Sequence, residues 1–380
     1  MQHAGPYREH ISVLARLREV TWGLVFLIVM VAGIGFATLY SVGGGKFDPW
    51  ATRQIVRFSF GLLIMFGAAM VDLRFWLRHA YLIYGAGLMM LVGVELVGLV
   101  SGGAQRWINL GFLRVQPSEV MKIALIIALA RYFHKSALED IARPSRLLAP
   151  LVMIAVPIAL VLKQPDLGTA ALLGAVGLAV MFAGGVKAWK FVVAGVAGLA
   201  ALPIGWSFLH SYQRGRILSF INPEGDPLGA GYHGLQAKIA LGSGGIWGKG
   251  FLQGSQSHLS FIPESQTDFA FAVLAEEFGM MGSYVLLALF ASIIGYGIVI
   301  GLRSRNQFGR LLALGLSVNF FLYVFINIAM VTGIFPVVGV PLPLISYGGT
   351  AMLTLMFGFG LVLSVYIHRD ARIGRFDDEI

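Results

Sequence analysis

Long apolar runs separated by short polar stretches dominate the chain. A helix needs roughly 20 apolar residues to cross the hydrocarbon core of a bilayer. Ten segments approach that length: 21–41, 55–72, 80–99, 117–133, 147–163, 167–184, 187–208, 268–301, 308–331 and 343–367. The pattern predicts an all-α polytopic membrane protein, with ten transmembrane helices in a single integral membrane domain over residues 1–380.

Composition agrees with this prediction. Hydrophobic residues make up 57% of the chain and charged residues 12%, about half the charged share usual in soluble proteins. Soluble enzymes, disordered proteins and nucleic-acid-binding proteins are therefore excluded. The chain has no cysteine, so it has no disulfide, no thiolate metal site and no cysteine nucleophile.

The basic residues predict the orientation of the spans. With a cytoplasmic N-terminus, the inner segments hold seventeen Lys and Arg residues, and the short outer loops and their flanks hold six. Cytoplasmic loops carry the excess of positive charge. We therefore expect both termini in the cytoplasm, and the net charge of +9 needs no nucleic-acid partner.

One extracytoplasmic loop is far longer than a connection requires. It joins spans seven and eight over residues 209–267 and contains an amphipathic stretch, Leu235–Leu241, and a glycine-rich stretch, Gly242–Gly250. We expect short helices lying at the membrane interface, and a glycine-rich backbone that can approach a ligand closely.

Ionisable side chains inside spans are costly and indicate function. Glu119 and Lys122 lie three residues apart on one helical face and can pair. Two roles are open: an ion pair that fixes the bundle, or contact with a ligand. Their helix begins with Gln116-Pro117-Ser118, and Gln164-Pro165-Asp166 begins the sixth span similarly. Two helix N-termini facing one cavity would favour an anion, although Gln-Pro also simply starts helices well.

Three carboxylates mark the start of the eighth span. Asp268 stands where the polar loop meets an apolar run. It fits either a helix cap or a general base for a lipid-linked substrate at the membrane boundary. The adjacent Glu276 and Glu277 point about 100° apart, and at least one must face a partner inside the protein. We expect a structural role for this pair.

The loop cations are candidates for phosphate recognition, because arginine binds phosphate through a planar fork of donors. They are Arg214, Arg216, Lys238 and Lys249, and Arg106 of the second outer loop can join them. Taken alone, each of them fits interfacial snorkelling better. No metal, P-loop or dinucleotide motif is found, so we expect no resident metal or cofactor; a divalent cation, Mg²⁺ or Mn²⁺, is compatible with pyrophosphate chemistry.

The last outer loop contains the most specific motif. Between Asn327 and Thr350 it carries three prolines and four glycines and ends in Ser346-Tyr-Gly-Gly-Thr350. Non-helical backbone at membrane depth is tolerated only where it lines a cavity or is buried in protein.

This stretch resembles the signature of the SEDS family (shape, elongation, division and sporulation proteins). Three further motifs support the resemblance: Gln116–Lys122, Gly242–Gly250 and Thr267–Glu277. The resemblance runs from the first span to about Arg369. The short N-terminus and the ending Met352–Arg369 resemble the elongation member of the family more than the division member.

The resemblance implies a peptidoglycan glycosyltransferase of the bacterial cytoplasmic (inner) membrane that polymerises lipid II. It also implies that the protein acts within an elongation complex, with a class B penicillin-binding protein docked on spans eight and nine. The family's essential loop aspartate falls on Asp268, and its cavity pair falls on Glu119 and Lys122. Many members have histidine at the position of Gln266, so a catalytic histidine is not expected here.

The mechanism that follows is an inverting displacement with Asp268 as the base. We expect Lys122 and Glu119 to line the polar cavity, with further substrate contacts from the motif residues Gln116, Ser118, Thr267 and Ser346. Two other functions remain open: a flippase for lipid-linked precursors, and a non-catalytic scaffold that recruits the transpeptidase.

Overall fold

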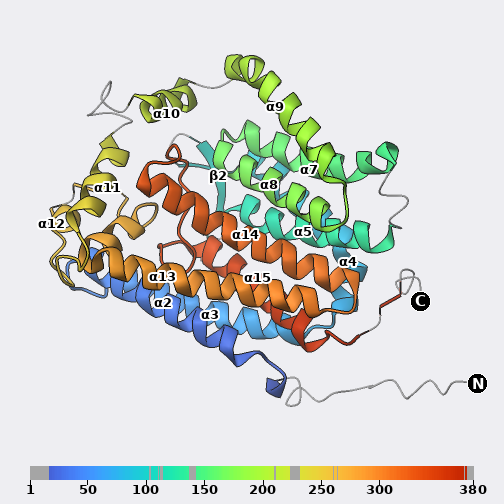
Figure 1. The fold of residues 1–380 in the computed structure, drawn as a ribbon, viewed down its shortest axis with the longest axis horizontal. Coiled ribbons are helices and arrows are strands. Elements are labelled where there is room, and N and C mark those ends of the chain that lie inside the picture. Colours follow the sequence, from blue (N-terminus) through green and yellow to red (C-terminus); the bar gives the residue numbers. More distant parts are fainter. Residues whose placement is uncertain are drawn as a thin grey trace, which may run out of the picture.

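The protein is described from a computed structural model, which covers residues 17–101, 104–109, 111, 114–136, 143–208, 211–222, 232–259, 261–262, 264–371 and 373–374. A bundle of long helices forms the body (Figure 1). The long helices are α2 (Trp22–Val42), α3 (Trp50–Met70), α4 (Leu73–Val97), α5 (Pro117–Lys135), α7 (Pro144–Lys163), α8 (Leu167–Ala183), α9 (Ala188–Phe208), α13 (Ala270–Arg303), α14 (Gln307–Thr332) and α15 (Gly349–Ile367).

Each predicted span corresponds to one of these helices. Seven of them are long and apolar enough to cross a membrane: α2, α3, α4, α7, α13, α14 and α15. The helix α8 is shorter, and the apolar stretch found in α9 covers Ala188–Ala201. A mostly helical membrane protein is therefore confirmed.

The prediction that the fold is entirely α-helical is wrong in one place. Between α4 and α5 the chain forms a three-stranded antiparallel sheet of β1 (Leu99–Ser101), β2 (Ala104–Asn109) and β3 (Arg114–Val115). Trp107 pairs with Leu99, and Ile108 pairs with Val115. The strands are too short for alternation to reveal them in the sequence.

Side chains and prolines set several helix boundaries. Asp72 caps α4 by accepting a hydrogen bond from Arg74 N (2.8 Å). Asn306 caps α14 by accepting from Gly309 N (2.6 Å). The predicted span 343–367 begins late, at Gly349, because the preceding proline-rich segment is not helical.

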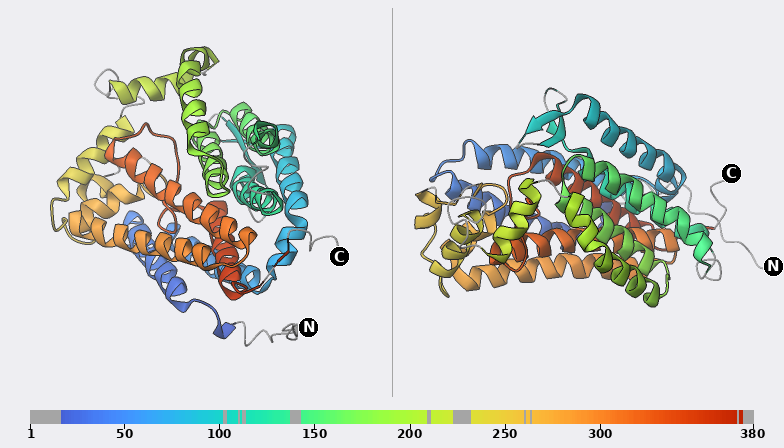
Figure 2. Two further views of the ribbon diagram at one scale, coloured as in Figure 1. Left: turned by 45° about the vertical axis from the view of Figure 1, so that its right-hand side comes forward. Right: turned by 90° about the horizontal axis from the view of Figure 1, so that it is seen from above.

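The segment between α9 and α13 contains the expected short helices α10 (Ser211–Ile221), α11 (Tyr232–Ser243) and α12 (Ser255–His258). The helix α11 packs on α13 and α14. Figure 2 shows α9 and α10 at the edge of the molecule, and most described side chains of α9 are exposed. Residues 209–210, 223–231, 260 and 263 of the predicted loop lie outside the described residues.

Several helices begin at one end of the bundle, which we call the Asp268 end. The backbone N–H of Tyr347, before α15, donates to Gln266 O, before α13 (2.7 Å). The backbone N–H of Gln116, before α5, donates to Thr350 Oγ1 in α15 (3.3 Å). The starts of α5, α13 and α15 are therefore joined directly, and the candidate site residues gather there.

Candidate functional site

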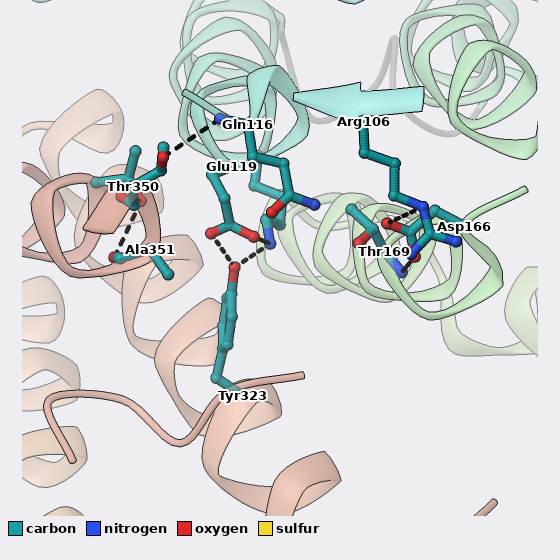
Figure 3. Close-up of polar contacts among 10 residues, drawn as sticks. Arg106, Gln116, Glu119, Asp166, Thr169, Tyr323, Thr350 and Ala351 are labelled. Atoms are coloured by element: carbon teal, nitrogen blue, oxygen red, sulfur yellow. Dashed lines mark hydrogen bonds and ion pairs between the residues drawn. The ribbon is translucent and has the colours of Figure 1, made fainter. Parts of the chain in front are cut away.

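A buried polar triad joins α5 and α14. Lys122 Nζ lies 2.7 Å from Glu119 Oε1 and also donates to the Tyr323 hydroxyl, which in turn donates to Glu119 Oε2 (Figure 3). Lys122 is 1% exposed and Glu119 is 6% exposed. Such deeply buried charges require a partner, and the triad satisfies both of them. The predicted Glu119–Lys122 pair is therefore present.

The triad borders a cavity between α2, α5, α13, α14 and α15. Glu119 and Tyr323 line it together with apolar side chains of α2, α13 and α15. Asn319 also lines the cavity, is 5% exposed, and has no hydrogen-bond donor for its Oδ1. A buried amide oxygen without a donor is rare. Glu119, Tyr323 and Asn319 give the cavity a polar edge, and its other walls are mostly apolar.

Arg106 holds the start of α8. From β2 its guanidinium donates to Gln164 O (3.2 Å) and Pro165 O (2.5 Å), and its Nε lies 3.6 Å from Asp166 Oδ2. Asp166 caps α8 by accepting from Thr169 N (3.2 Å), as Figure 3 shows. At this second Gln-Pro helix start, the Asp166 carboxylate offsets the positive end of the helix dipole. Arg106 fixes the same start to the sheet.

Asp268 lies on the turn before α13 and is partly exposed. Asn327 Nδ2 donates to Asp268 O (2.9 Å) and to Val340 O (2.7 Å). One amide of α14 therefore fixes both the turn and the loop 333–348 between α14 and α15, which we call the signature loop. A Cβ at Gly339 would lie 3.2 Å from Asp268 Oδ2. The N-cap residue of α13 is Phe269, so Asp268 does not stand at the helix-cap position that the sequence left open.

The signature loop is held by buried hydrogen bonds. Ser346 Oγ accepts from Leu342 N (2.9 Å), and Ser346 O accepts from Gln54 Nε2 of α3 (2.9 Å). Thr350 Oγ1 donates to Arg114 O (2.7 Å). The loop therefore connects α3, β3, α5 and α13, and Ser346 is 4% exposed.

The remaining predicted residues have other surroundings. Thr267 Oγ1 donates to Glu264 Oε2 (3.0 Å), and Ser118 is 2% exposed at the start of α5. Arg214 donates to Trp206 O (3.2 Å) and Ser207 O (2.9 Å). The side chain of Arg216 lies outside the described residues.

Lys249 is paired with a buried carboxylate. Its Nζ lies 2.7 Å from Glu276 Oε1, which also accepts from Gln256 N (2.9 Å). Ser41 Oγ donates to the neighbouring Glu277. The structural role expected for Glu276 and Glu277 therefore has a physical basis. Arg106, Arg214 and Lys249 each bond to groups of the protein itself.

Three residues that complete the site were absent from the predicted set: Tyr323, Asn327 as an anchor, and Asp166 as the partner of Arg106. Tyrosine and asparagine carry no charge, so the search for charges inside spans passes over them. Asp166 was visible as part of Gln164-Pro165-Asp166. Among the described residues, no group of three or more His, Asp or Glu side chains is placed to hold a metal ion.

Comparison with known proteins places this geometry in a family. The sequence profile of the FtsW, RodA and SpoVE group, described as cell cycle protein, matches residues 16–371. The chain is 48% identical to peptidoglycan glycosyltransferase MrdB of Escherichia coli K12, over 91% of this chain and 93% of that protein.

Two solved structures resemble it along most of its length. One is a chain from a study of how a peptidoglycan synthase complex coordinates polymerization and crosslinking: TM-score 0.79, 32% identity, 92% of this chain and 98% of that chain. The other is the rod shape determining protein RodA of Thermus thermophilus: TM-score 0.71, 28% identity, 93% and 98% coverage. The chain therefore belongs to the FtsW, RodA and SpoVE family, the shape, elongation, division and sporulation proteins.

Proposed function

We propose that this protein is a peptidoglycan glycosyltransferase that polymerises lipid II into glycan strands during cell elongation. MrdB is named a peptidoglycan glycosyltransferase and is 48% identical over 91% of this chain, which supports the enzyme class. The likeness to a rod shape determining protein supports elongation. The protein would lie in the bacterial inner membrane with ten spans, both termini in the cytoplasm and the Asp268 end outside.

The observation that carries the mechanism is the placement of Asp268. It is the partly exposed carboxylate of a turn that Asn327 fixes to the signature loop. A general base must be held within hydrogen-bond reach of the proton that it removes. In this proposal Asp268 takes the proton of the acceptor hydroxyl, whose oxygen attacks the anomeric carbon, and polyprenyl pyrophosphate leaves with the bonding electrons.

The triad has a different role in this proposal. Glu119, Lys122 and Tyr323 satisfy one another, so they form the fixed polar edge of the cavity rather than the source of a proton. Gln116, Ser118, Thr267 and Ser346 lie at or near the starts of α5, α13 and α15, where the proposal places the substrate. No resident metal belongs to the proposal; Mg²⁺ or Mn²⁺ would enter only as a counter-ion of the pyrophosphate.

The partner in the proposal is a class B penicillin-binding protein that docks on spans eight and nine, within a larger elongation complex. The similar peptidoglycan synthase complex coordinates polymerization and crosslinking, which supports such a partner. The corresponding helices α13 and α14 present exposed apolar side chains, including Val285, Leu302, Phe321 and Phe325, that a transmembrane helix can cover.

The test is incubation of the purified protein with lipid II, with or without its partner, and sizing of the products on a gel. We expect Asp268→Asn to abolish polymer formation, since the amide cannot accept the proton; base catalysis typically contributes about 10²–10⁴ in rate. The control is Asp370→Asn, an exposed carboxylate after α15 that pairs with Arg305. Normal polymerisation by Asp268→Asn would end the base assignment.

The same assay separates the alternatives. A flippase would move lipid II between leaflets of a vesicle without lengthening it. A scaffold would leave polymer formation to other proteins, and Asp268→Asn would then support growth normally. Polymer made by the purified wild-type chain, and lost in Asp268→Asn, is the result that the proposed function requires.

A further inference from the structure

Arg57 on α3 is a charged side chain without a counter-ion in the described part of the chain. It is partly buried, and its guanidinium carbon lies 4.4 Å from the centroid of the Tyr347 ring. Its Nη1 is enclosed and has no acceptor, and the described chain provides no hydrogen bond or ion pair to any of its nitrogens. A cation taken out of water without an anion is costly.

Two other enclosed cations of the described bundle differ from Arg57 by having a counter-ion, and Arg131 differs by donating to Arg78 O (2.7 Å). Lys122 is paired with Glu119, and Lys249 is paired with Glu276. Gln54, one turn before Arg57, donates to Ser346 O and is itself neutral. Among the described residues, the charge of Arg57 is therefore stabilised only by the face of Tyr347, which typically contributes about 0.5–2 kcal/mol.

The surroundings of Arg57 add to its positive potential. A Cβ at Gly349 would lie 3.4 Å from Arg57 Cζ and Nε, so the guanidinium lies directly against the first residue of α15. The N-cap of this 19-residue helix, Gly348, provides no side-chain acceptor. The N-terminal partial charge of α15 thus reinforces the guanidinium instead of being cancelled.

Arg57 is also linked to the proposed catalytic turn. Tyr347, on which the guanidinium stacks, donates its N–H to Gln266 O, two residues before Asp268 (2.7 Å). Trp50 packs edge-on with the Tyr347 ring, with ring centroids 4.9 Å apart. A ligand on Arg57 would therefore lie at the same end of the bundle as the base.

We infer that Arg57, assisted by the start of α15, binds the pyrophosphate of the lipid-linked substrate. The inference rests on the proposed function and names a residue for its leaving group. A guanidinium fork matches phosphate oxygens in geometry and charge. When the bond between the anomeric carbon and the phosphate oxygen breaks, the electron pair goes to the pyrophosphate, and a fixed positive charge there stabilises the departing group.

The experiment measures binding of farnesyl pyrophosphate to the purified full-length protein in phosphatidylcholine nanodiscs by calorimetry. We expect Arg57→Gln to weaken binding by about 10- to 100-fold, as for loss of a hydrogen-bonded charge. Arg57→Lys keeps the charge but loses the planar fork of donors, so its affinity should lie between those of the wild type and Arg57→Gln. The matched control is Arg53→Gln, an exposed arginine one turn earlier on α3, which should bind as the wild type does.

The outcomes separate this inference from the proposed function. Unchanged binding in both Arg57 variants, or equal losses in Arg57→Gln and Arg53→Gln, would overturn the pyrophosphate site even if the wild type polymerises lipid II. Displacement of farnesyl pyrophosphate by phosphatidylglycerol in the nanodiscs, at similar affinity, would assign Arg57 to ordinary phospholipid headgroups instead. A wild type that binds farnesyl pyrophosphate through Arg57 yet makes no polymer would refute the proposed function alone.

Discussion

Lys122 shows how a lysine is accommodated inside the bundle. Its ammonium group contacts both Glu119 and Tyr323, and it lies 4.2 Å from the centroid of the Tyr323 ring. The tyrosine hydroxyl accepts from the lysine and donates to the carboxylate, so it joins the two charges. Residue spacing predicts the Glu119–Lys122 pair. Tyr323 is 201 residues away from Lys122, so its contact with Lys122 depends on how α14 packs on α5 and is not predicted by spacing.

Tyr323→Phe tests the contribution of this hydroxyl. We expect the variant to lower the free energy of unfolding by about 1–2 kcal/mol, because both charges lose a partner while keeping each other. Lys122→Ala should cost about 3–5 kcal/mol, since it leaves Glu119 buried without its cation. Thermal unfolding in detergent measures both changes.

Tyr366→Phe is the control for Tyr323→Phe. Tyr366 lies near the end of α15, where its ring faces Arg369, and loss of its hydroxyl should change stability by less than about 0.5 kcal/mol. Equal stability of the two variants would show that the triad is not coupled through Tyr323.

At the scale of elements, α13 is broken near its start and completed by the glycine-rich loop. Gly279 has φ 65° and ψ −160° inside the helix. There the loop substitutes for helical hydrogen bonds: Met280 N donates to Gly245 O (2.9 Å), and Gly250 N donates to Glu277 O (3.0 Å). The sequence indicated a glycine-rich backbone that can approach a ligand closely. In the structure, this backbone approaches α13 of the same chain.

Gly248→Ala should disrupt this docking. Gly248 has φ +80°, and a Cβ there would overlap Glu277 O, so the variant combines backbone strain with a clash against backbone. We expect a loss of about 2–6 kcal/mol in the free energy of unfolding. Gly44→Ala is matched for the left-handed backbone, with φ +66° and no atom within 4 Å, and should cost only about 1–2 kcal/mol. Similar unfolding temperatures for the two variants would contradict the docking role.

Helix existence was predictable from the sequence, while boundaries and short strands were not. The apolar run from residue 343 suggested a continuous span, yet Pro343 and the positive φ of Leu344 (65°) keep the backbone non-helical until Gly349. The sheet before α5 depends on pairing between strands of two to six residues, and Arg106 anchors it through contacts with α8 that no local pattern encodes.

At the scale of the whole molecule, contacts between turns gather at two ends of the bundle. At the end opposite Asp268, Arg305 N donates to Arg369 O (3.0 Å), and Ser364 Oγ donates to Val71 O (2.7 Å). These contacts join turns that carry many of the basic residues assigned to the cytoplasm. The Asp268 end joins the starts of α5, α13 and α15. The proposed ten spans require these two sets of turns to lie on opposite sides of the membrane, which is a prediction that labelling can test.

Cysteine labelling tests which of these two ends faces out, because the chain has no cysteine of its own and a single introduced thiol is labelled without background. Lys46, between α2 and α3, and Lys187, between α8 and α9, are exposed lysines in short turns. We expect a membrane-impermeant maleimide to label Lys46→Cys in intact cells, and Lys187→Cys only after permeabilisation, since the basic inner segments remain in the cytoplasm. The reverse pattern would place Asp268 and Arg57 on the cytoplasmic side, where they could not act on a glycan strand outside, and the proposed function would fail with the topology.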